Sequence, residues 1–215
     1  MKILVTAATE MELSPLKILV AKNRSLKKRT DFLVTGIGMT ATAYHMAKHN
    51  KRKYDLAVNI GVAGSFTKKI SIGEVVNVKS DCFADLGAED GNSFLTLAEI
   101  GLQQENQFPF REGRIFNKTV KRNSVLRGLK QVSAITVNTV HGDAESIKKV
   151  MQKFNPDIET MEGAAFFYVC MMEKISCVQL RTISNFVERR NRDNWNIPLA
   201  IKNLTEVVYD FLNIV

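Results

Sequence analysis

The sequence predicts an α/β fold in which helices cover both faces of a central, mainly parallel sheet. Short apolar runs that favour strands alternate with helical stretches, and several of the runs end at glycine or at a polar segment. This alternation is typical of consecutive β-α-β units, whose parallel sheets are buried on both faces. A chain of 215 residues suits one such unit, so we predict a single domain over residues 1–215.

The first half of the chain contributes three strands and two helices to this prediction. Apolar runs place the strands at Ile3–Ala7, Phe32–Val34 and Leu56–Ile60. Apolar side chains at helical spacing indicate a helix through Glu12 to Val20, and Met39–Asn50 has a helical pattern as well. The second and third strands are expected to end at the turns Gly36-Ile37-Gly38 and Gly61-Val62-Ala63-Gly64.

The second half repeats the alternation. Strands are expected at Val75–Val78, Ala134–Val137 and Cys177–Ile183. A helix follows Asp143 and ends near Phe154, because proline in Asn155-Pro156 cannot continue it. A buried helix over Glu162–Lys174 and a final helix over Pro198–Leu212 complete the pattern.

The segment Asp85–Asn123 is less regular than the rest and richer in polar residues and glycine. Long irregular segments inside a domain are either functional loops or stretches without a clear pattern. Two interpretations therefore stay open: a loop that covers the substrate, or an excursion without that role.

The charge of the chain argues weakly for a nucleic-acid partner. Thirty Lys and Arg against 22 Asp and Glu give a net charge of +8. Much of it comes from residues 22–29 and 48–53, which lack the interleaved aromatic side chains of a base-stacking surface. Both clusters fall where helices are expected to end, and cations stabilise helix C-termini. No nucleic-acid or membrane partner is expected.

The N-terminal segment and the cysteines favour a cytoplasmic location. The apolar run at the N-terminus is followed at once by Glu10 and Glu12, and it is too short for a signal peptide or a membrane span. Cys82, Cys170 and Cys177 have no CxxC spacing, so reduced cysteines are expected. No His, Cys and Asp cluster has the spacing of metal ligands, and no metal or organic cofactor is expected.

Polar residues at the ends of the predicted strands are the candidates for a site, because open α/β sheets bind ligands there. Glu12 alone is typical of a carboxylate in the first turn of a helix. Glu162 differs, because it lies between Met161 and the small and aromatic residues of 163–167, where an unpaired carboxylate is costly. A buried Glu after a strand is a functional candidate, although a structural ion pair stays open.

Taken together, these segments resemble the nucleoside phosphorylase/nucleosidase superfamily, specifically its hydrolytic branch. The matching segments, in order, are Glu12, Thr35-Gly36-Ile37-Gly38, Asn59-Ile60-Gly61-Val62-Ala63-Gly64, Thr160-Met161-Glu162 and Arg181-Thr182-Ile183-Ser184-Asn185. The resemblance extends from Met1 to about Ile201. It implies a three-layer α/β/α domain with a central mixed, mainly parallel sheet, and a homodimer or higher homo-oligomer whose partner subunit helps to complete the pocket.

Within that superfamily the chain looks most like the futalosine hydrolases of the menaquinone pathway. Three segments carry this resemblance: Thr136-Val137-Asn138-Thr139-Val140, Met161-Glu162-Gly163-Ala164-Ala165 and the stretch from Ser184 to Trp195. Two positions depart from the pattern. His141 stands where a small hydroxyl residue is expected, and Thr160 replaces the first Glu of Glu-Met-Glu.

The resemblance implies a role for each matching residue. Glu12 would activate water as a general base, and Glu162 would accept hydrogen bonds from the ribose hydroxyls and stabilise a cationic sugar. Met161 would pack beneath the ribose, although a core methionine is an equally natural interpretation. The remaining residues expected to bind substrate are Ala63, Gly64, Asn138, Val140 and Trp195, the last of which could instead anchor the final helix.

Asn185 is expected to select the base. The adenine-specific nucleosidases have Asp at this position, whereas an amide offers one donor and one acceptor. It can donate to O6 of a 6-oxopurine and accept from N7–H, which favours hypoxanthine as the leaving base. A turn-forming Asn after a strand is the alternative interpretation.

Four functional hypotheses follow. The first is hydrolysis of futalosine, and the second is hydrolysis of methylthioadenosine, S-adenosylhomocysteine or aminodeoxyfutalosine. A nucleoside phosphorylase is disfavoured, because the loop from Ala7 to Glu12 has two carboxylates and no Arg to hold phosphate. The third hypothesis is a nucleoside sensor without catalysis, and the fourth is a nucleic-acid-binding protein. For the carboxylate tail of futalosine, Arg111, Arg114 and the run 189–192 are candidates.

Overall fold

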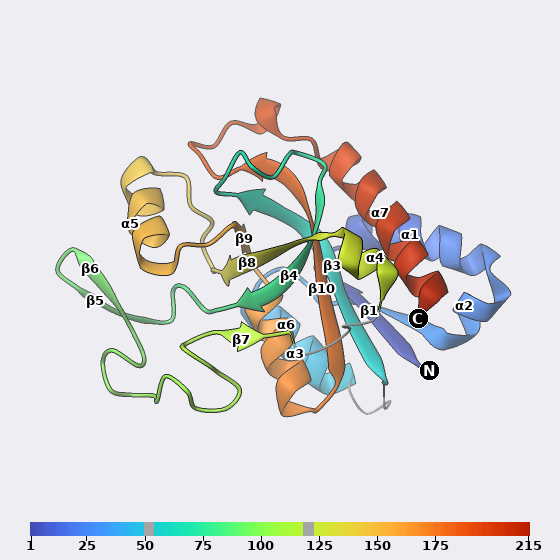
Figure 1. Ribbon diagram of the computed structural model, residues 1–215, viewed down its shortest axis with the longest axis horizontal. Helices are drawn as coiled ribbons and strands as arrows, with labels where there is room; N and C mark the ends of the chain where they lie inside the picture. The colour runs from blue at the N-terminus through green and yellow to red at the C-terminus, as the bar shows by residue number, and fades with distance from the viewer. Residues whose placement is uncertain (50–53, 118–122) are drawn as a thin grey trace.

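The computed structural model describes residues 1–49, 54–117 and 123–215, and all structural statements below concern these residues (Figure 1). Asn50, residues 51–53 of the second basic cluster, and residues 118–122 of the middle segment lie outside them. The strands are β1 (Ile3–Ala7), β2 (Thr30–Val34), β3 (Leu56–Ser65), β4 (Val75–Asp81), β5 (Gly87–Asp90), β6 (Ser93–Thr96), β7 (Ile115–Phe116), β8 (Lys130–Thr136), β9 (Ile158–Thr160) and β10 (Ser176–Phe186).

The helices alternate with these strands, as the sequence predicts. They are α1 (Glu10–Lys22), α2 (Arg24–Arg29), α3 (Met39–His49), α4 (Ser124–Gly128), α5 (Ala144–Phe154), α6 (Gly163–Met172) and α7 (Ile197–Ile214), with a short 3-10 helix, η1, at Arg192–Asn194. Every predicted strand and helix is present. The basic cluster near Lys22 does not simply end a helix, because its remaining residues form α2, which Asn23 caps by accepting the Ser25 and Leu26 N–H groups.

The central sheet is mixed and mainly parallel, which confirms the predicted fold class. One parallel group is β2-β1-β3-β10, and the other is β4-β8-β9. The two groups meet antiparallel at both seams, β10 with β4 and β3 with β9, so this part of the sheet closes on itself. Strand β9 runs antiparallel to the end of β3. The residues that follow β9 therefore continue in the direction of Gly61.

Strand β3 is longer than the sequence predicts. The segment Gly61–Gly64, expected as a turn, continues the strand to Ser65 and pairs with β10 as far as Phe186. Glycine at 61 permits close approach here, because a Cβ would lie 2.6 Å from Nη1 of Arg181 and 2.9 Å from Oε1 of Glu12. The missing side chain of Gly61 thus leaves room for these two polar groups.

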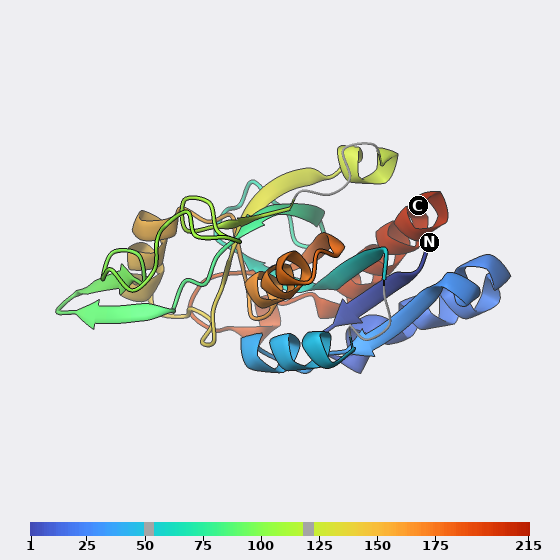
Figure 2. The same cartoon turned by 90° about the horizontal axis from the view of Figure 1, so that it is seen from below.

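Helices cover the sheet on two sides, each with its own apolar core. On one side α1, α2 and α7 pack over β1, β3 and β10, with Leu13, Leu204 and Phe211 fully buried. On the other side α3 and α6 lie against the sheet, with Met46, Phe166 and Phe167 in the core. Figures 1 and 2 show both termini near the α1–α2 end of the molecule.

The middle segment of the chain forms the opposite end of the molecule. In both views the β5–β6 hairpin and α5 project away from the termini (Figure 2). Lys153 of α5 is paired with Glu99 at 2.7 Å, and Phe94 of the hairpin packs against Phe154. A cavity of about 740 Å³ lies between this segment and α5. The described contacts leave both interpretations of the segment open.

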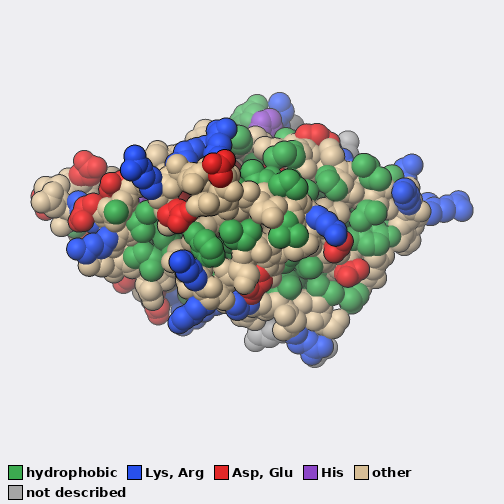
Figure 3. Space-filling model, turned by 90° about the horizontal axis from the view of Figure 1, so that it is seen from above, with side chains coloured by type: hydrophobic (Ala, Val, Ile, Leu, Met, Phe, Trp, Pro, Cys, Tyr) green, Lys and Arg blue, Asp and Glu red, His purple; other side chains and the backbone are tan. Residues whose placement is uncertain are grey.

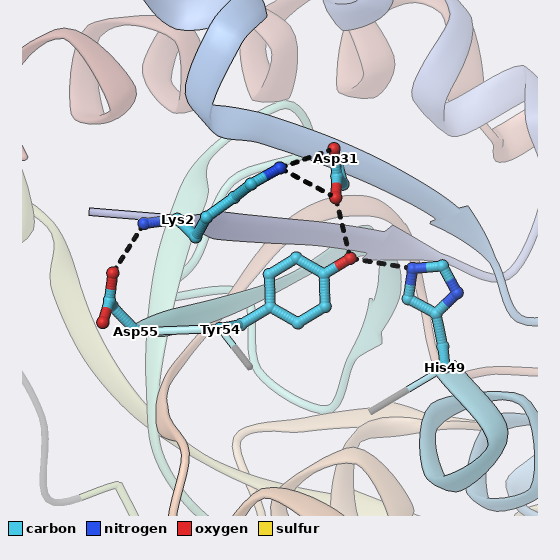
Figure 4. Close-up of polar contacts among 5 residues, drawn as sticks. All are labelled: Lys2, Asp31, His49, Tyr54 and Asp55. Atoms are coloured by element: carbon cyan, nitrogen blue, oxygen red, sulfur yellow. Dashed lines mark hydrogen bonds and ion pairs between the residues drawn. The ribbon is translucent and has the colours of Figure 1, made fainter. Parts of the chain in front are cut away.

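A polar cluster ties the amino ends of β1, β2 and β3 together (Figure 4). Nζ of Lys2 lies 3.3 Å from Oδ2 of Asp31, and the hydroxyl of Tyr54 donates to the same carboxylate at 2.9 Å. His49 contacts the Tyr54 hydroxyl at 2.9 Å, and Asp55 accepts the Lys2 N–H. These contacts join the end of α3 to the sheet at the edge remote from the segments that carry the predicted site.

Basic side chains do not gather into one patch on the face seen in Figure 3. Lys and Arg are scattered there, mostly toward the rim, with hydrophobic and neutral side chains between them. In the described residues, no helix is long and apolar enough to cross a bilayer.

Candidate active site

Glu12 belongs to the first turn of α1, and its carboxylate also contacts β3. Oε2 accepts the backbone N–H of Thr9 at 3.0 Å and its hydroxyl at 2.8 Å. Oε1 turns toward β3 and accepts the Val62 N–H at 3.2 Å. The side chain is 7% exposed. Glu10, by contrast, points to solvent and pairs with Lys17, so only one carboxylate of the first loop is directed inward.

Glu162 lies at the start of α6, directly after β9, and is 8% exposed. Oε1 accepts the backbone N–H of Gly38 at 3.0 Å. Burial raises the pKa of this carboxyl above its ordinary value, and the negative charge of Glu12 raises it further. The Arg181 guanidinium and the Gly38 N–H oppose the shift. The pKa of Glu162 is therefore raised overall, with burial as the main cause.

Arg181 is the cation that accompanies both carboxylates. It projects from the middle of β10 and is 1% exposed. Burial lowers its pKa, while Glu162 first, then Glu12 and Asp81, raise it. Its Nη2 donates to Oδ1 of Asn59, and its Nε donates to Oε1 of Gln179 at 3.2 Å. These two hydrogen bonds fix the orientation of the guanidinium.

A third buried carboxyl, that of Asp81, lies near this group. Asp81, at the end of β4, accepts from Nε2 of Gln179 at 3.1 Å, from the Thr136 hydroxyl at 3.0 Å and from the Cys82 N–H at 2.8 Å. Burial raises its pKa to about 6, although the hydrogen bonds from Gln179 and Thr136 and the charges of Arg114 and Arg181 act in the opposite direction. Gly163 makes room for the network, since a Cβ there would lie 2.3 Å from Oδ2 of Asp81.

Asn185 lies near the end of β10, beside Gly64 of β3. Its Oδ1 accepts from the Ser184 hydroxyl at 2.8 Å, and its Nδ2 donates to the Phe186 carbonyl at 2.9 Å. One hydrogen of Nδ2 and one lone pair of Oδ1 remain beyond these two bonds. A Cβ on Gly64 would lie 3.5 Å from Nδ2 and 2.9 Å from Cγ2 of Val187, so glycine leaves room here for the Val187 side chain beside the amide.

The other predicted residues lie on the segments around this group. Ala63 is buried in β3, and Met161 is half-buried between β9 and Glu162. Val140 is 41% exposed, and exposed Asn138 is held by Asp85, whose Oδ2 accepts its N–H at 2.6 Å. Trp195 follows the 3-10 helix with the Arg190 guanidinium 5.2 Å from its ring centroid.

The candidate arginines for a carboxylate tail differ in their contacts. Arg114 donates to the Ser80 hydroxyl, to Sγ of Cys82 and to the Ala134 carbonyl. Its guanidinium is therefore hydrogen-bonded to β4, to the residue that follows β4 and to β8. Arg111 is exposed and lies over the Phe116 ring. The exposed run 189–192 includes Arg190, which lies over Trp195.

The structure also assigns polar positions to residues for which the sequence suggested no role. Arg181 was quoted only as part of a motif, and Asp81, Gln179 and Glu159 were not singled out. An Arg and a Gln inside the apolar run Cys177–Ile183 were the available signal, because a buried cation requires partners. In the described residues, no group of three His, Cys, Asp or Glu side chains could hold a metal ion.

The arrangement is suited to stabilising a cation and activating water. The charges of Glu12 and Glu162 both act on the Arg181 guanidinium, so two buried acids are accompanied by one buried cation beside Gly61. A carboxylate held by N–H donors can remove a proton from a bound water. A nearby second carboxylate can stabilise positive charge that develops on a reacting sugar.

Comparisons with known proteins show the family of the chain. The family model described as "Phosphorylase superfamily" matches residues 27–213. The futalosine hydrolase of Thermus thermophilus is 29% identical over 181 residues, which cover 82% of this chain and 78% of the relative. A 5′-methylthioadenosine/S-adenosylhomocysteine nucleosidase of Buchnera aphidicola subsp. Schizaphis graminum is 25% identical over 97% of this chain and 94% of its own length.

The fold recurs among solved structures. The native structure of futalosine hydrolase from Helicobacter pylori superimposes with a TM-score of 0.82 and covers all of this chain and 98% of its own. Its sequence identity is 15%, so this similarity concerns the fold.

Proposed function

This chain belongs to the phosphorylase superfamily, and from that premise we propose that it is an N-glycosyl hydrolase that acts on futalosine. The products would be hypoxanthine and dehypoxanthine futalosine, and the reaction would belong to the futalosine pathway of menaquinone biosynthesis. The observation that carries the proposal is the buried group of Glu12, Glu162 and Arg181, with the amide of Asn185 farther along the same strand as Arg181.

Hydrolysis follows from the chemistry of the two carboxylates. A water molecule near Glu12 would lose a proton to the carboxylate as its oxygen bonds to the anomeric carbon. The C–N bond breaks at the same time, and its electron pair leaves with the purine, which takes up a proton from solvent at N7. The developing ribosyl cation resembles the oxocarbenium-like centre of glycoside hydrolysis, which negative charge stabilises. Glu162 supplies that charge and accepts from the sugar hydroxyls.

Burial makes the contribution of Glu162 larger than that of an exposed carboxylate. The charge acts in a desolvated site, where electrostatic interactions are stronger than in water. Arg181 keeps this carboxyl ionised, since its positive charge opposes the rise in pKa that burial produces. Without the guanidinium, two carboxylates would compete for one proton.

The identity of the base rests on Asn185. Its free amide hydrogen can donate to O6 of hypoxanthine, and its free lone pair can accept from N7–H as the base leaves. The site of an adenine-specific enzyme requires the opposite pattern at the 6-position. The similarity to the futalosine hydrolase of T. thermophilus supports the same substrate.

The first loop supports water rather than phosphate as the nucleophile. Glu12 is directed inward, and no Arg lies between Ala7 and Glu12 to bind an anion. A phosphate ion would be repelled by this carboxylate. A cytoplasmic location and a homo-oligomer whose partner completes the pocket remain further parts of the proposal.

The proposal is tested with purified protein in phosphate-free buffer. Futalosine, aminodeoxyfutalosine, inosine and methylthioadenosine are supplied separately, and the released base is measured by chromatography. Hypoxanthine from futalosine is the expected product. Release of adenine from methylthioadenosine would instead support the second hypothesis, which the similarity to the Buchnera nucleosidase favours. An obligatory requirement for phosphate would contradict the role of Glu12.

A matched pair of variants tests the general base. Glu12→Gln should lower kcat by about 10²–10⁴-fold, the usual contribution of general-base catalysis. Glu10→Gln removes the same charge from the same helical turn but lies in solvent, so it should keep normal activity. Equal losses in both variants would show that the effect comes from the helix terminus rather than from water activation.

A further inference from the structure

Glu159 lies in the same row of the sheet as Asn185, across Gly64. Gly64 pairs with Asn185 of β10 on one side and with Glu159 of β9 on the other. A Cβ on Gly64 would lie 3.5 Å from Nδ2 of Asn185 and 4.0 Å from Cγ of Glu159. Both side chains therefore border Gly64 on one face of the sheet, where Cγ2 of Val187 is the third neighbour, 2.9 Å from such a Cβ.

The Glu159 carboxylate is buried and held by one residue. The side chain is 4% exposed. Its Oε1 accepts the backbone N–H of His141 at 3.0 Å, and its Oε2 lies 2.7 Å from Nδ1 of the same histidine. The His141 ring packs edge-on against Phe66. Each carboxylate oxygen can accept more than one hydrogen bond, so acceptor capacity remains on both.

We propose that Glu159 is a specificity-determining residue that reads the N1 position of the purine, and that His141 positions its carboxylate. The inference rests on the proposed function, since Asn185 locates the base. Hypoxanthine presents an acceptor, O6, beside a donor, N1–H. An amide donor and a carboxylate acceptor on either side of Gly64 match that pair of groups.

Adenine has the opposite pattern along this edge. Its N1 is an acceptor, and an ionised carboxylate offers no hydrogen to it. Binding adenine would leave a buried carboxylate facing a lone pair, which costs free energy. A site built to bind a substrate N–H rejects an analogue without it much more strongly than an apolar pocket does.

His141 explains how the carboxylate keeps its orientation. When Nδ1 carries the hydrogen, the residue donates twice to Glu159, once from the backbone and once from the ring. A small hydroxyl residue, expected here from the family pattern, could not span the same pair of oxygens. The replacement at 141 therefore accompanies the acid at 159.

Binding of the free bases tests the inference without requiring futalosine cleavage. Isothermal titration of the full chain with hypoxanthine and with adenine measures the ratio of the two dissociation constants. The wild type should prefer hypoxanthine. In Glu159→Gln the amide can donate to adenine N1, and the preference should fall by about 10- to 100-fold, the effect of a charge-assisted hydrogen bond of ordinary strength.

Three further variants separate recognition from structure. Glu145→Gln, an exposed carboxylate in the first turn of α5, should keep the wild-type ratio. His141→Ala should lower the ratio, and His141→Asn should restore much of it, because its amide can donate to Glu159. If Glu159→Gln fails to fold, the two His141 variants carry the test.

The outcomes are distinguishable from those for the proposed function. A folded Glu159→Gln with an unchanged ratio overturns the inference even if the wild type cleaves futalosine. A wild type that binds neither base, or that prefers adenine, overturns it as well. A ratio that depends on Glu159 supports it even if futalosine proves not to be the substrate.

Discussion

The backbone N–H of Gly38 donates a 3.0 Å hydrogen bond to Oε1 of Glu162, across a sequence separation of 124 residues. Gly38 has φ +92, in the region that residues with a Cβ rarely adopt. The N–H is one of the groups that oppose the rise in the pKa of Glu162. A backbone conformation available to glycine thus helps to stabilise a buried negative charge.

Substitution of Gly38 should therefore affect both stability and activity. Gly38→Ala should lower the free energy of unfolding by about 1–2 kcal/mol, the cost of a left-handed residue with a Cβ. It should also lower kcat/KM, because a shifted N–H would stabilise ionised Glu162 less. Gly101→Ala is the control, since Gly101 has φ +77 and, like Gly38, no atom within 4 Å of a Cβ. Denaturant unfolding and initial rates measure the two effects, and equal loss of activity in both variants would contradict this role.

The guanidinium of Arg181 should prove necessary for both carboxylates. Arg181→Met should cost about 3–5 kcal/mol, the usual penalty for leaving buried charges without their partner. It should also shift the acid limb of the pH–rate profile upward, because the pKa of Glu162 rises when its cation is removed. Arg181→Lys should shift that limb less. Arg127→Met, at an exposed position of α4, should change stability by less than about 0.5 kcal/mol. An unmoved acid limb in Arg181→Met would contradict the coupling.

Asp81 should make the stability of the protein depend on pH. Its pKa is raised from 3.8 to about 6 by burial, so the folded state binds the proton more tightly than the unfolded state. The resulting stabilisation is fully present below pH 3.8 and is lost as the pH rises to about 6. Such a shift corresponds to about 3 kcal/mol. Denaturant unfolding between about pH 3.5 and about pH 7 should show this loss in the wild type.

Asp81→Asn should remove that part of the slope. Its absolute stability should also fall, because the new Nδ2 would face Nε2 of Gln179. The slope, rather than the absolute value, is therefore the informative quantity. Asp90→Asn, at an exposed position of β5, should keep the slope of the wild type. If Asp81→Asn keeps the same slope, the raised pKa of Asp81 is wrong.

The cluster at the amino ends of the strands should contribute to stability without affecting the reaction. Tyr54→Phe removes the hydroxyl that contacts both Asp31 and His49, at a cost of about 1–2 kcal/mol. Tyr44→Phe is the matched control, because its exposed hydroxyl has only a 3.4 Å contact with Lys48. Both variants should keep wild-type kcat/KM. A loss of activity in Tyr54→Phe alone would show that this edge is coupled to the site.

The sequence by itself determined the order of the strands and helices and the polar segments that follow them. Short apolar runs that end at glycine or at a polar segment indicated β1, β2 and β10, because a strand buried on both faces is mostly apolar. The setting of Glu162 also made it a candidate, since a carboxylate amid apolar residues needs a reason to be buried. The resemblance to the family, carried by the order of the motifs, predicts that Glu12, Glu162 and Asn185 belong to one site.

Only the tertiary structure decided which of these groups meet. The strand periodicity in the sequence specifies which face a side chain occupies, but it does not specify its partner on the neighbouring strand. The antiparallel seam between β3 and β9 places Glu159 opposite Gly64, and the parallel pairing of β3 with β10 places Asn185 on its other side. The continuation of β3 through Gly61 likewise brings Arg181 against Glu12, because the missing Cβ leaves room for both. Strand register, which depends on packing of the whole sheet, is the physical reason that the site could not be assembled from the sequence alone.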